Sequence, residues 1–497
     1  MSDPQTGTVT TEVPARLDRL PWSRWHWMIV CGLGAVWILD GLEVTIVGNI
    51  STQIAKPGSG LHVTTAQISG LAAALYVGGA CTGALLFGYL TDRFGRKKLF
   101  MITLGTYLAA TALTAASFAP WWFFMFRFLT GLGIGGEYAA INSAIDELIP
   151  SRHRGLIDIV INGTYWAGAA AGALLTVPAT SDLAVDVGWR VCFGVGVVLG
   201  TAVLMIRRNV PESPRWLFIH GRNREAETLV DGIEQRVEKD TGRQLPAAGR
   251  SITIRQRKTI GFVTIAKTMF TLYPRRTILG FSLFVGQAFL YNAITFGFAQ
   301  ILQTFFGVKT SPGYYFAVIA VGNLLGPLLL GRLFDTVGRK PMIAGTYIIS
   351  GILLLITAWV FDAGYLTAIT MTACWCGVLF FASAGASSAY LTVSEVFPME
   401  TRALAIAFFY AIGTGAGGIS GPLLFSSLVS TGNIFDTAIA FVIGASLMII
   451  AGLVEIFLGV KAERRSLEDI AQPLTAAEAQ HQQSNESRQP GQAGSRY

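Results

Sequence analysis

Three carboxylates and one guanidinium lie inside long apolar stretches, where ionised side chains are costly. Asp40 and Glu43 stand three residues apart in WILDGLEVTIVG, so on a helix they share one face. Arg127 opens the stretch RFLTGLGIGGEY, and Glu137 lies ten residues after it. A carboxylate that a nearby cation keeps ionised, and that takes up a proton when the cation moves away, can carry a proton through an apolar interior. These residue types therefore indicate proton uptake and release.

The elements that must position these side chains are helices that cross a bilayer. Of the 497 residues, 52% are hydrophobic and 13% are charged, whereas a soluble domain carries about 25% charged residues. Apolar runs of about 20 residues recur along the chain, and each is long enough to cross a ~30 Å hydrocarbon core. We predict an all-α membrane protein of about twelve transmembrane helices in two six-helix, pseudo-symmetric halves, with spans at 27–49, 66–90, 99–118, 121–146, 156–178, 189–208, 276–303, 313–331, 342–361, 365–392, 403–430 and 436–458.

Depth along these spans predicts which charges meet. Asp40 lies about 9 residues from the outer end of its span and Arg127 about 6, so at ~1.5 Å per residue their depths differ by ~5 Å. We therefore expect Arg127 to be the partner of Asp40, either in a proton-coupling pair or in a fixed ion pair that only joins two helices. Glu43 could share the proton or contact a solute. Glu137 is expected to line the lower cavity or to pair with another helix.

The distribution of basic residues predicts orientation. With both termini inside, the cytoplasmic segments hold 33 of the 37 Lys and Arg residues, and the outside loops hold only Lys56 and Lys309. This is the positive-inside bias of inner-membrane proteins, so the net charge of +7 does not indicate a nucleic-acid partner. The predicted organisation is a cytoplasmic segment at 1–26, a six-helix half at 27–208, a cytoplasmic linker at 209–275 with an amphipathic helix near 222–239, a second half at 276–458, and a disordered cytoplasmic tail at 459–497.

Several other chemistries do not fit the pattern. All five cysteines fall inside spans without His or Asp to complete a ligand set, which argues against disulfides and against a metal site. Two G-x-G-x-x-G stretches, at 131–136 and 413–418, lie in apolar spans and predict close helix packing instead of dinucleotide binding. The chain has no P-loop motif, and its five histidines form no cluster. We expect no cofactor, no metal and no enzymatic activity.

The two halves repeat each other in sequence. GYLTDRFGRKK at 88–98 and GRLFDTVGRKP at 331–341 follow the second span of each half, and ELIPSRHR at 147–154 and EVFPMETR at 395–402 follow two helices later. The offsets, 243 and 248 residues, agree within a small insertion. Parallel six-helix repeats of this kind place a solute site between the halves near the bilayer midplane.

These motifs, together with PESPRW at 211–216, give the chain a resemblance to a known family. Over about residues 25–460 it resembles the major facilitator superfamily, and within it the sugar porters and related proton-coupled symporters of organic and aromatic acids. The resemblance implies that a carboxylate of the first helix and the arginine of the fourth form the proton-linked pair. It also implies ion pairs that close the cytoplasmic side, formed by Asp92, Arg96, Glu147, Arg154, Asp335, Arg339, Glu395 and Arg402.

The same resemblance suggests residues that contact a solute. Gln287 and Asn292 match a sugar-contacting Gln and Asn, but Gly286 and Leu290 depart from the sugar-porter pattern. The Pro-x-x-Trp stretch of sugar porters is also missing near Tyr390. The alternative interpretation is that these polar side chains only serve helix packing. The candidates for solute binding are Asn162, Tyr165, Trp166, Gln287, Tyr291, Asn292, Trp375 and Tyr390.

We therefore expect a secondary active transporter that moves a sugar or an organic or aromatic acid by alternating access, with proton symport. A uniporter, a proton-antiport exporter and a transporter-like sensor are the alternatives. The expected partners are the solute, protons and the lipid bilayer, and the sequence implies neither nucleic acid nor a protein partner.

Overall fold

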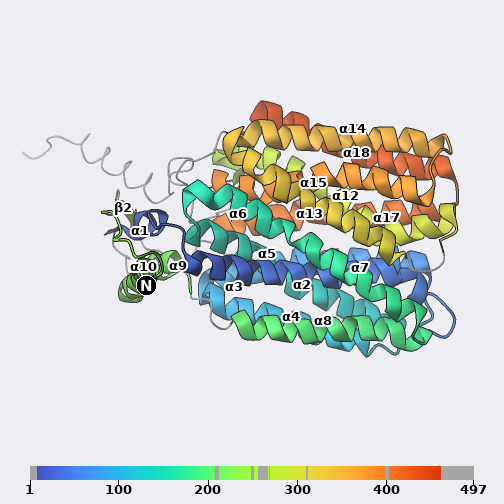
Figure 1. Ribbon diagram of the computed structural model, residues 1–497, viewed down its shortest axis with the longest axis horizontal. Coiled ribbons are helices and arrows are strands. Elements are labelled where there is room, and N and C mark those ends of the chain that lie inside the picture. Colours follow the sequence, from blue (N-terminus) through green and yellow to red (C-terminus); the bar gives the residue numbers. More distant parts are fainter. Residues whose placement is uncertain are drawn as a thin grey trace, which may run out of the picture.

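The computed structural model describes residues 8–207, 212–247, 251–255, 267, 269–308, 312–397 and 402–460. Most of this chain forms long helices that run side by side (Figure 1). The first half contains α2 (Arg24–Ile54), the π-helical turn η1 (Gln67–Ala72) with α3 (Ala73–Phe94), α4 (Arg96–Ala115), α5 (Pro120–Leu148), α6 (Ser151–Gly163) with α7 (Tyr165–Ser181), and α8 (Val185–Arg207). The second half contains α12 (Pro274–Phe306), α13 (Gly313–Thr336), α14 (Arg339–Asp362), α15 (Ala368–Val396), α16 (Arg402–Phe409) with η2 (Tyr410–Thr414) and α17 (Gly415–Ser430), and α18 (Ile434–Leu458).

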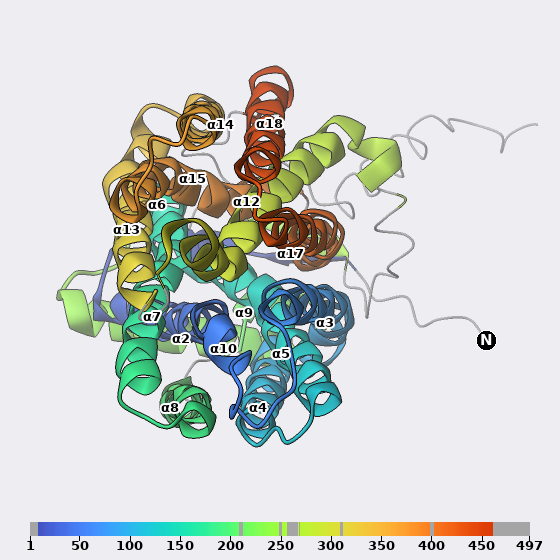
Figure 2. The ribbon, with the colours of Figure 1, turned by 90° about the vertical axis from the view of Figure 1, so that its right-hand side faces the viewer.

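Ten helices in the described part of the chain are long and apolar enough to cross a membrane. The two remaining predicted spans correspond to α5 and to the α6–α7 pair. The view along the bundle shows α2, α3, α4, α5, α7 and α8 on one side, and α12, α14, α15, α17 and α18 on the other (Figure 2). Helices α6 and α7 pack against α13 across the boundary between the halves. The all-α membrane architecture is therefore confirmed.

Glycines bring helices of one half into close contact. A Cβ atom on Gly131 would lie 2.0 Å from the carbonyl oxygen of Tyr76, and one on Gly135 would lie 1.9 Å from that of Ala80. In the second half, a Cβ on Gly417 would lie 2.4 Å from the carbonyl oxygen of Val285. Small residues allow such approaches of helix backbones inside a bilayer. The two glycine-rich stretches therefore serve helix packing, as the sequence predicted.

A small assembly lies at one end of the bundle, which we call the linker end (Figure 1). It contains α1 (Val13–Asp18), α9 (Pro214–Ile219) and α10 (Asn223–Thr241), the last of which is the predicted amphipathic helix. The buried side chains of α10 follow a helical period, as its amphipathic pattern requires: Ala226, Val230, Ile233 and Val237. Two short strands that the sequence did not predict, β1 (Thr8–Thr11) and β2 (Ile252–Arg255), pair antiparallel with Thr8 opposite Arg255.

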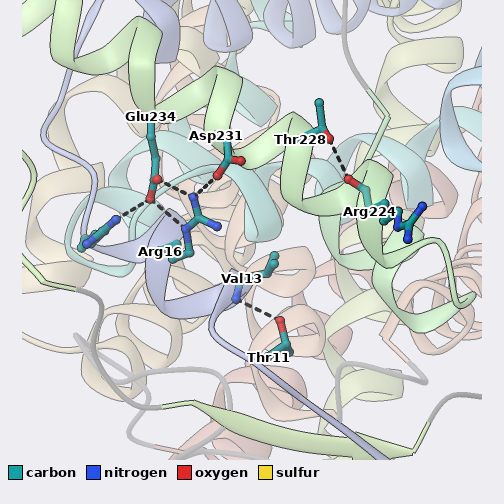
Figure 3. Close-up of polar contacts among 8 residues, drawn as sticks. Thr11, Val13, Arg16, Arg224, Thr228, Asp231 and Glu234 are labelled. Carbon is teal, nitrogen blue, oxygen red and sulfur yellow. Dashed lines mark hydrogen bonds and ion pairs between the residues drawn. The ribbon is translucent and has the colours of Figure 1, made fainter. Parts of the chain in front are cut away.

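Ion pairs tie α1 to α10, as Figure 3 shows. Arg16 donates to Asp231 and to Glu234 at 2.5 Å, and Arg19 donates to Glu234 at 2.6 Å. Burial would raise the pKa of the Glu234 carboxyl, but the hydrogen bonds from the two arginines outweigh it and lower that pKa below its ordinary value. Asp18 in turn accepts a hydrogen bond of 2.6 Å from the backbone amide of Ser151. Helix α1 thus connects the linker helix to the start of α6.

Candidate functional site

A cavity of about 120 Å³ lies between the two halves. Five helices of the first half (α2, α3, α5, α6 and α7) and three segments of the second (α12, α15 and η2) contribute to its wall. The lining residues are Trp37, Val44, Tyr76, Val77, Tyr138, Asn162, Tyr165, Trp166, Gln287, Ala288, Tyr291, Asn292, Thr295, Ser383, Ala386, Ser387, Tyr390, Tyr410 and Thr414. None of these side chains carries a charge at neutral pH, so the cavity offers a solute aromatic faces, hydroxyl groups and amides.

Aromatic rings from both halves meet around this cavity. Trp37 stacks on Tyr138 with ring centroids 4.7 Å apart and an interplanar angle of 8°. Tyr138 meets Tyr410 of the second half at 4.9 Å. On the α6–α7 side, Trp166 meets Tyr291 at 5.2 Å. Ring pairs of this kind bury large apolar faces while the phenolic hydroxyls remain able to hydrogen-bond.

Two asparagines of the wall have orientations that their own helices determine. The Asn162 amide nitrogen donates to the Asp158 carbonyl at 2.8 Å, and the Asn292 amide nitrogen donates to the Ala288 carbonyl at 2.9 Å. A backbone carbonyl only accepts hydrogen bonds, so the bonded atom of each amide must be the nitrogen. The carbonyl oxygen is then the end of each amide that points away from its helix backbone. Each amide has an oxygen that can accept and a second N–H that can donate, so the two asparagines add polar groups of both kinds to the wall.

An ion pair is buried beside the cavity. Arg127 Nη1 lies 2.7 Å from Glu43 Oε1, and neither side chain is exposed. The guanidinium carbon lies 5.1 Å from the ring centre of Tyr76, which lines the cavity, and 5.8 Å from that of Phe193. The pair is therefore one aromatic side chain away from the space between the halves.

The expected partner of Arg127 was Asp40, and the ion pair that the structure shows is with Glu43. Glu43 lies three residues nearer the outer end of its span than Asp40 does, which is about 4.5 Å along a helix. That rise removes the depth difference of about 5 Å that separated Asp40 from Arg127. The helix rotation, which no spacing along the sequence reveals, then brings Glu43 to the guanidinium.

Asp40 is fully buried and belongs to the cavity-facing side of α2. Trp37 and Val44 line the cavity three residues before it and four residues after it, so the three positions share a helix face. Asp40 also lies within electrostatic range of Tyr76 and Tyr165, two tyrosines of the wall. Asp40 thus lies on the cavity-facing side of α2, although it does not itself line the cavity.

Two other candidates occupy different places. Glu137 is buried and accepts a hydrogen bond of 3.4 Å from the Thr103 hydroxyl on α4, so it contacts another helix and does not line the central cavity. Trp375, a candidate for solute contact, does not line this cavity either. Its ring packs edge-on against Phe441 of α18 with centroids 5.2 Å apart. The other seven candidates for solute contact all lie in the cavity wall.

The halves also meet on either side of this cavity. At the linker end, the backbone amide of Leu156 on α6 donates to Asp335 on α13 at 2.9 Å, and Arg339 lies 2.7 Å from the same carboxylate. At the opposite end, the Ser69 hydroxyl lies 2.9 Å from the Gln300 amide oxygen and 3.1 Å from the Ser426 hydroxyl. This conformation therefore holds the two halves together at both ends.

The predicted cytoplasmic gate is described only in part. Asp335 and Arg339 form the contact with α6, while Arg154 donates to the carbonyl of Ile149 in its own half at 3.4 Å. The backbone amide of Arg96 donates to Glu212 of the linker at 2.9 Å. The side chains of Asp92, Glu147, Glu395 and Arg402 lie outside the described residues.

Sequence reasoning missed several residues of the wall. Trp37, Tyr76, Tyr138 and Tyr410 all line the cavity. Each is an aromatic residue with a polar atom in the middle of an apolar span, and such a residue needs a hydrogen-bond partner or a polar cavity. That feature could have identified them. The hydroxyls of Thr295, Ser383, Ser387 and Thr414 carry a weaker signal because Ser and Thr commonly bond to their own helix.

This fold, with two helical halves around a central cavity, defines a class of multi-pass membrane transporters. The family model described as "Sugar (and other) transporter" matches residues 27–474, so the chain belongs to this family of the major facilitator superfamily. The niacin transporter NiaP of Acinetobacter baylyi is 27% identical over 92% of this chain and 99% of its own length. Plastidic glucose transporter 4 of Arabidopsis thaliana is 27% identical over 90% of this chain and 80% of its own length.

The fold is similar to that of the proton:xylose symporter XylE bound to 6-bromo-6-deoxy-D-glucose. That structure has a TM-score of 0.71 and 18% identity, and the match covers 90% of this chain and 98% of that one. Family and fold together make this protein a transporter of the membrane and not an enzyme.

Proposed function

We propose that the chain is a secondary active transporter that moves a small polar metabolite, a sugar or an organic or aromatic acid, across the inner membrane by proton symport. The observation that carries the proposal is the buried Glu43–Arg127 pair beside a central cavity lined by both halves. A buried ion pair is a costly arrangement, so a functional role explains it better than stability does.

Alternating access gives this arrangement its mechanism. The cavity opens to one side when the halves separate at the linker end, and to the other side when they separate at Ser69 and Gln300. The linker end faces the cytoplasm in this proposal, because 33 of the 37 basic residues belong to segments on that side or to the tail.

Proton coupling would follow from competition for one guanidinium. Arg127 contacts Glu43 in this conformation, and Asp40 lies one helical turn away on the same helix. When the halves rock, a shift of Arg127 from one carboxylate to the other changes which of them needs a proton. A proton taken up on one side of the membrane would then be released on the other.

The wall of the cavity supports a solute with hydrogen-bond donors and a flat or apolar face. The carbonyl oxygens of Asn162 and Asn292 accept hydrogen bonds, and the rings of Trp37 and Trp166 offer surfaces for stacking. A sugar satisfies these acceptors with its hydroxyls. An aromatic acid that crosses together with its proton satisfies these acceptors with its carboxyl O–H. The relative NiaP is named a niacin transporter, and niacin is an aromatic acid.

Uptake by reconstituted vesicles tests the proposal. Labelled sugars and labelled aromatic and aliphatic carboxylates are offered with an inward proton gradient, with and without a proton ionophore. We expect one solute class to accumulate above equilibrium and the ionophore to abolish that accumulation. Equilibration that ignores the ionophore would identify a uniporter. Accumulation only when the gradient points outward would identify a proton-antiport exporter, and binding without any flux would identify a sensor.

A further inference from the structure

A second hollow, unrelated to the central cavity, lies at the linker end between the linker and the first half. This groove of about 780 Å³ shares no residue with the central cavity. Helix α2, the start of α4, α9 and one face of α10 form it. Its lining residues are Trp25, Met28, Lys97, Glu212, Leu217, Arg222, Arg224, Glu225, Thr228, Leu229, Gly232, Ile233 and Arg236.

The groove has an apolar floor. Trp25 and Leu217 are buried at its base, together with Ile233 of α10. Met28, one turn further along α2, is 37% exposed. The exposed Met28 side chain beside this buried floor suits an aliphatic chain better than water.

The charges of the groove are unbalanced. Its two carboxylates already have partners, because Glu212 accepts from the backbone amides of Arg96 and Lys97, and Glu225 accepts from Arg222 Nε at 2.8 Å. Lys97, Arg224 and Arg236 are exposed and have no ion pair with any residue that the structure describes. Three cations therefore remain for an anion.

The arginines of α10 lie on the face of the helix that forms the groove. Arg224, Thr228, Gly232 and Arg236 follow one another at steps of four residues, so they align along one side of the helix. Asp231 and Glu234, which hold Arg16 of α1, do not line the groove. An anion bound by the arginines of the groove therefore need not displace the α1–α10 ion pairs.

The position of the groove along α2 indicates the membrane boundary. Trp22, Trp25 and Trp27 cluster at the start of this helix, and Trp27 is 55% exposed. Tryptophans gather where headgroups meet hydrocarbon. The exposed side chains of Met28 and Cys31 continue from there along the membrane-spanning part of the helix.

We propose that this groove binds an anionic phospholipid, with its headgroup held by the cations Lys97, Arg224 and Arg236 that line the groove and an acyl chain along Met28. Basic pockets at the cytoplasmic boundary recognise anionic headgroups by this chemistry. The apolar floor and its continuation along α2 favour a lipid over a soluble phosphate. The bound lipid would fasten the linker helix to the membrane surface beside the first half.

Titration of the purified full-length protein in detergent with phosphatidylglycerol, followed by native mass spectrometry, tests this site. Phosphatidylcholine with the same acyl chains is the zwitterionic comparison. We expect tighter binding of phosphatidylglycerol to the unmodified protein. The double variant Arg224→Gln/Arg236→Gln should bind it roughly 30-fold more weakly, because each cation near an anionic headgroup contributes about 1 kcal/mol.

A matched control separates this site from general surface charge. Lys239→Gln/Arg243→Gln removes the same charge from exposed positions at the end of α10 that do not line the groove, and it should retain full affinity. Equal losses in both double variants, or equal binding of the two lipids by the unmodified protein, would overturn the proposal. Displacement of phosphatidylglycerol by an equal concentration of inorganic phosphate would also overturn it, in favour of a soluble anion. Phosphatidylcholine binding by each variant checks that it is folded.

Discussion

At the scale of single residues, the two carboxylates of α2 that lie near the cavity have different surroundings. Arg127 holds Glu43 at 2.7 Å, and Asp40 lies on the face of α2 that also carries Trp37 and Val44. The carboxylate that pairs with Arg127 and the carboxylate on the cavity-facing side of α2 are thus different residues. This difference makes their substitutions distinguishable.

Substitution of Asp40 tests whether it carries the proton. Asp40→Asn resembles the protonated carboxyl permanently, so the variant should still exchange solute across the membrane by counterflow. Uphill accumulation driven by a proton gradient should be lost, because no proton is carried back. Counterflow and accumulation measured in the same vesicles check both statements. Full accumulation by Asp40→Asn would assign the essential proton to Glu43 or Glu137.

Substitution of the ion pair tests its contribution to stability. Arg127→Ala leaves Glu43 buried without its cation, and Glu43→Gln leaves Arg127 without its anion, so each should cost about 3–5 kcal/mol. The double variant removes both charges and should recover a large part of that loss. Thermal unfolding of the three purified variants measures it. Additive losses in the double variant would contradict a coupled pair.

At the scale of elements, glycine positions determine how closely the helices pack. A Cβ on Gly135 would lie 1.9 Å from the Ala80 carbonyl oxygen, whereas a Cβ on Gly105 would meet nothing within 4 Å. The two positions lie on neighbouring helices of the same half, α5 and α4. Their difference is therefore one of packing and not of helix propensity.

Gly135→Ala should destabilise the first half by about 1–3 kcal/mol, because backbones of α3 and α5 must separate. Gly105→Ala should be neutral or slightly stabilising, since alanine is the better helix former. The yield of monodisperse protein in detergent and its unfolding temperature compare the two. Similar behaviour of both variants would show that α3 and α5 do not pack this closely in the membrane.

At the scale of the whole molecule, the contacts between the halves must break one end at a time. Ser69 of the first half lies 3.1 Å from Ser426 of the second, measured between their hydroxyl oxygens. The linker end has its own contact between Leu156 and Asp335. Transport by rocking requires the first of these contacts to open when the cavity faces away from the linker end.

A disulfide at Ser69→Cys/Ser426→Cys should therefore block transport. We expect oxidation of the double variant to abolish solute flux and a reductant to restore it. Ser426→Cys alone should remain active under oxidising conditions, and its activity is the control for the five native cysteines. Undiminished flux through the fully cross-linked protein would contradict rocking of the halves about the cavity.

The sequence by itself determined the membrane class, the repeat of the halves and the linker helix. Each depends on a local property: a run of apolar residues long enough to span, a motif repeated at a constant offset, and the helical period of Ala226, Val230, Ile233 and Val237. It also identified seven side chains of the cavity wall, because polar residues inside a span require a polar environment.

Only the tertiary structure decided which of these side chains meet. Helix rotation and tilt place Glu43 against Arg127, Trp375 against Phe441 and Tyr138 against Tyr410. The spacing of residues along one helix does not determine these rotation and tilt angles. The pairing of β1 with β2 and the groove above Trp25 likewise join segments about 200 residues apart or more. Contacts of that separation depend on the packing of the whole chain, so local patterns do not predict them.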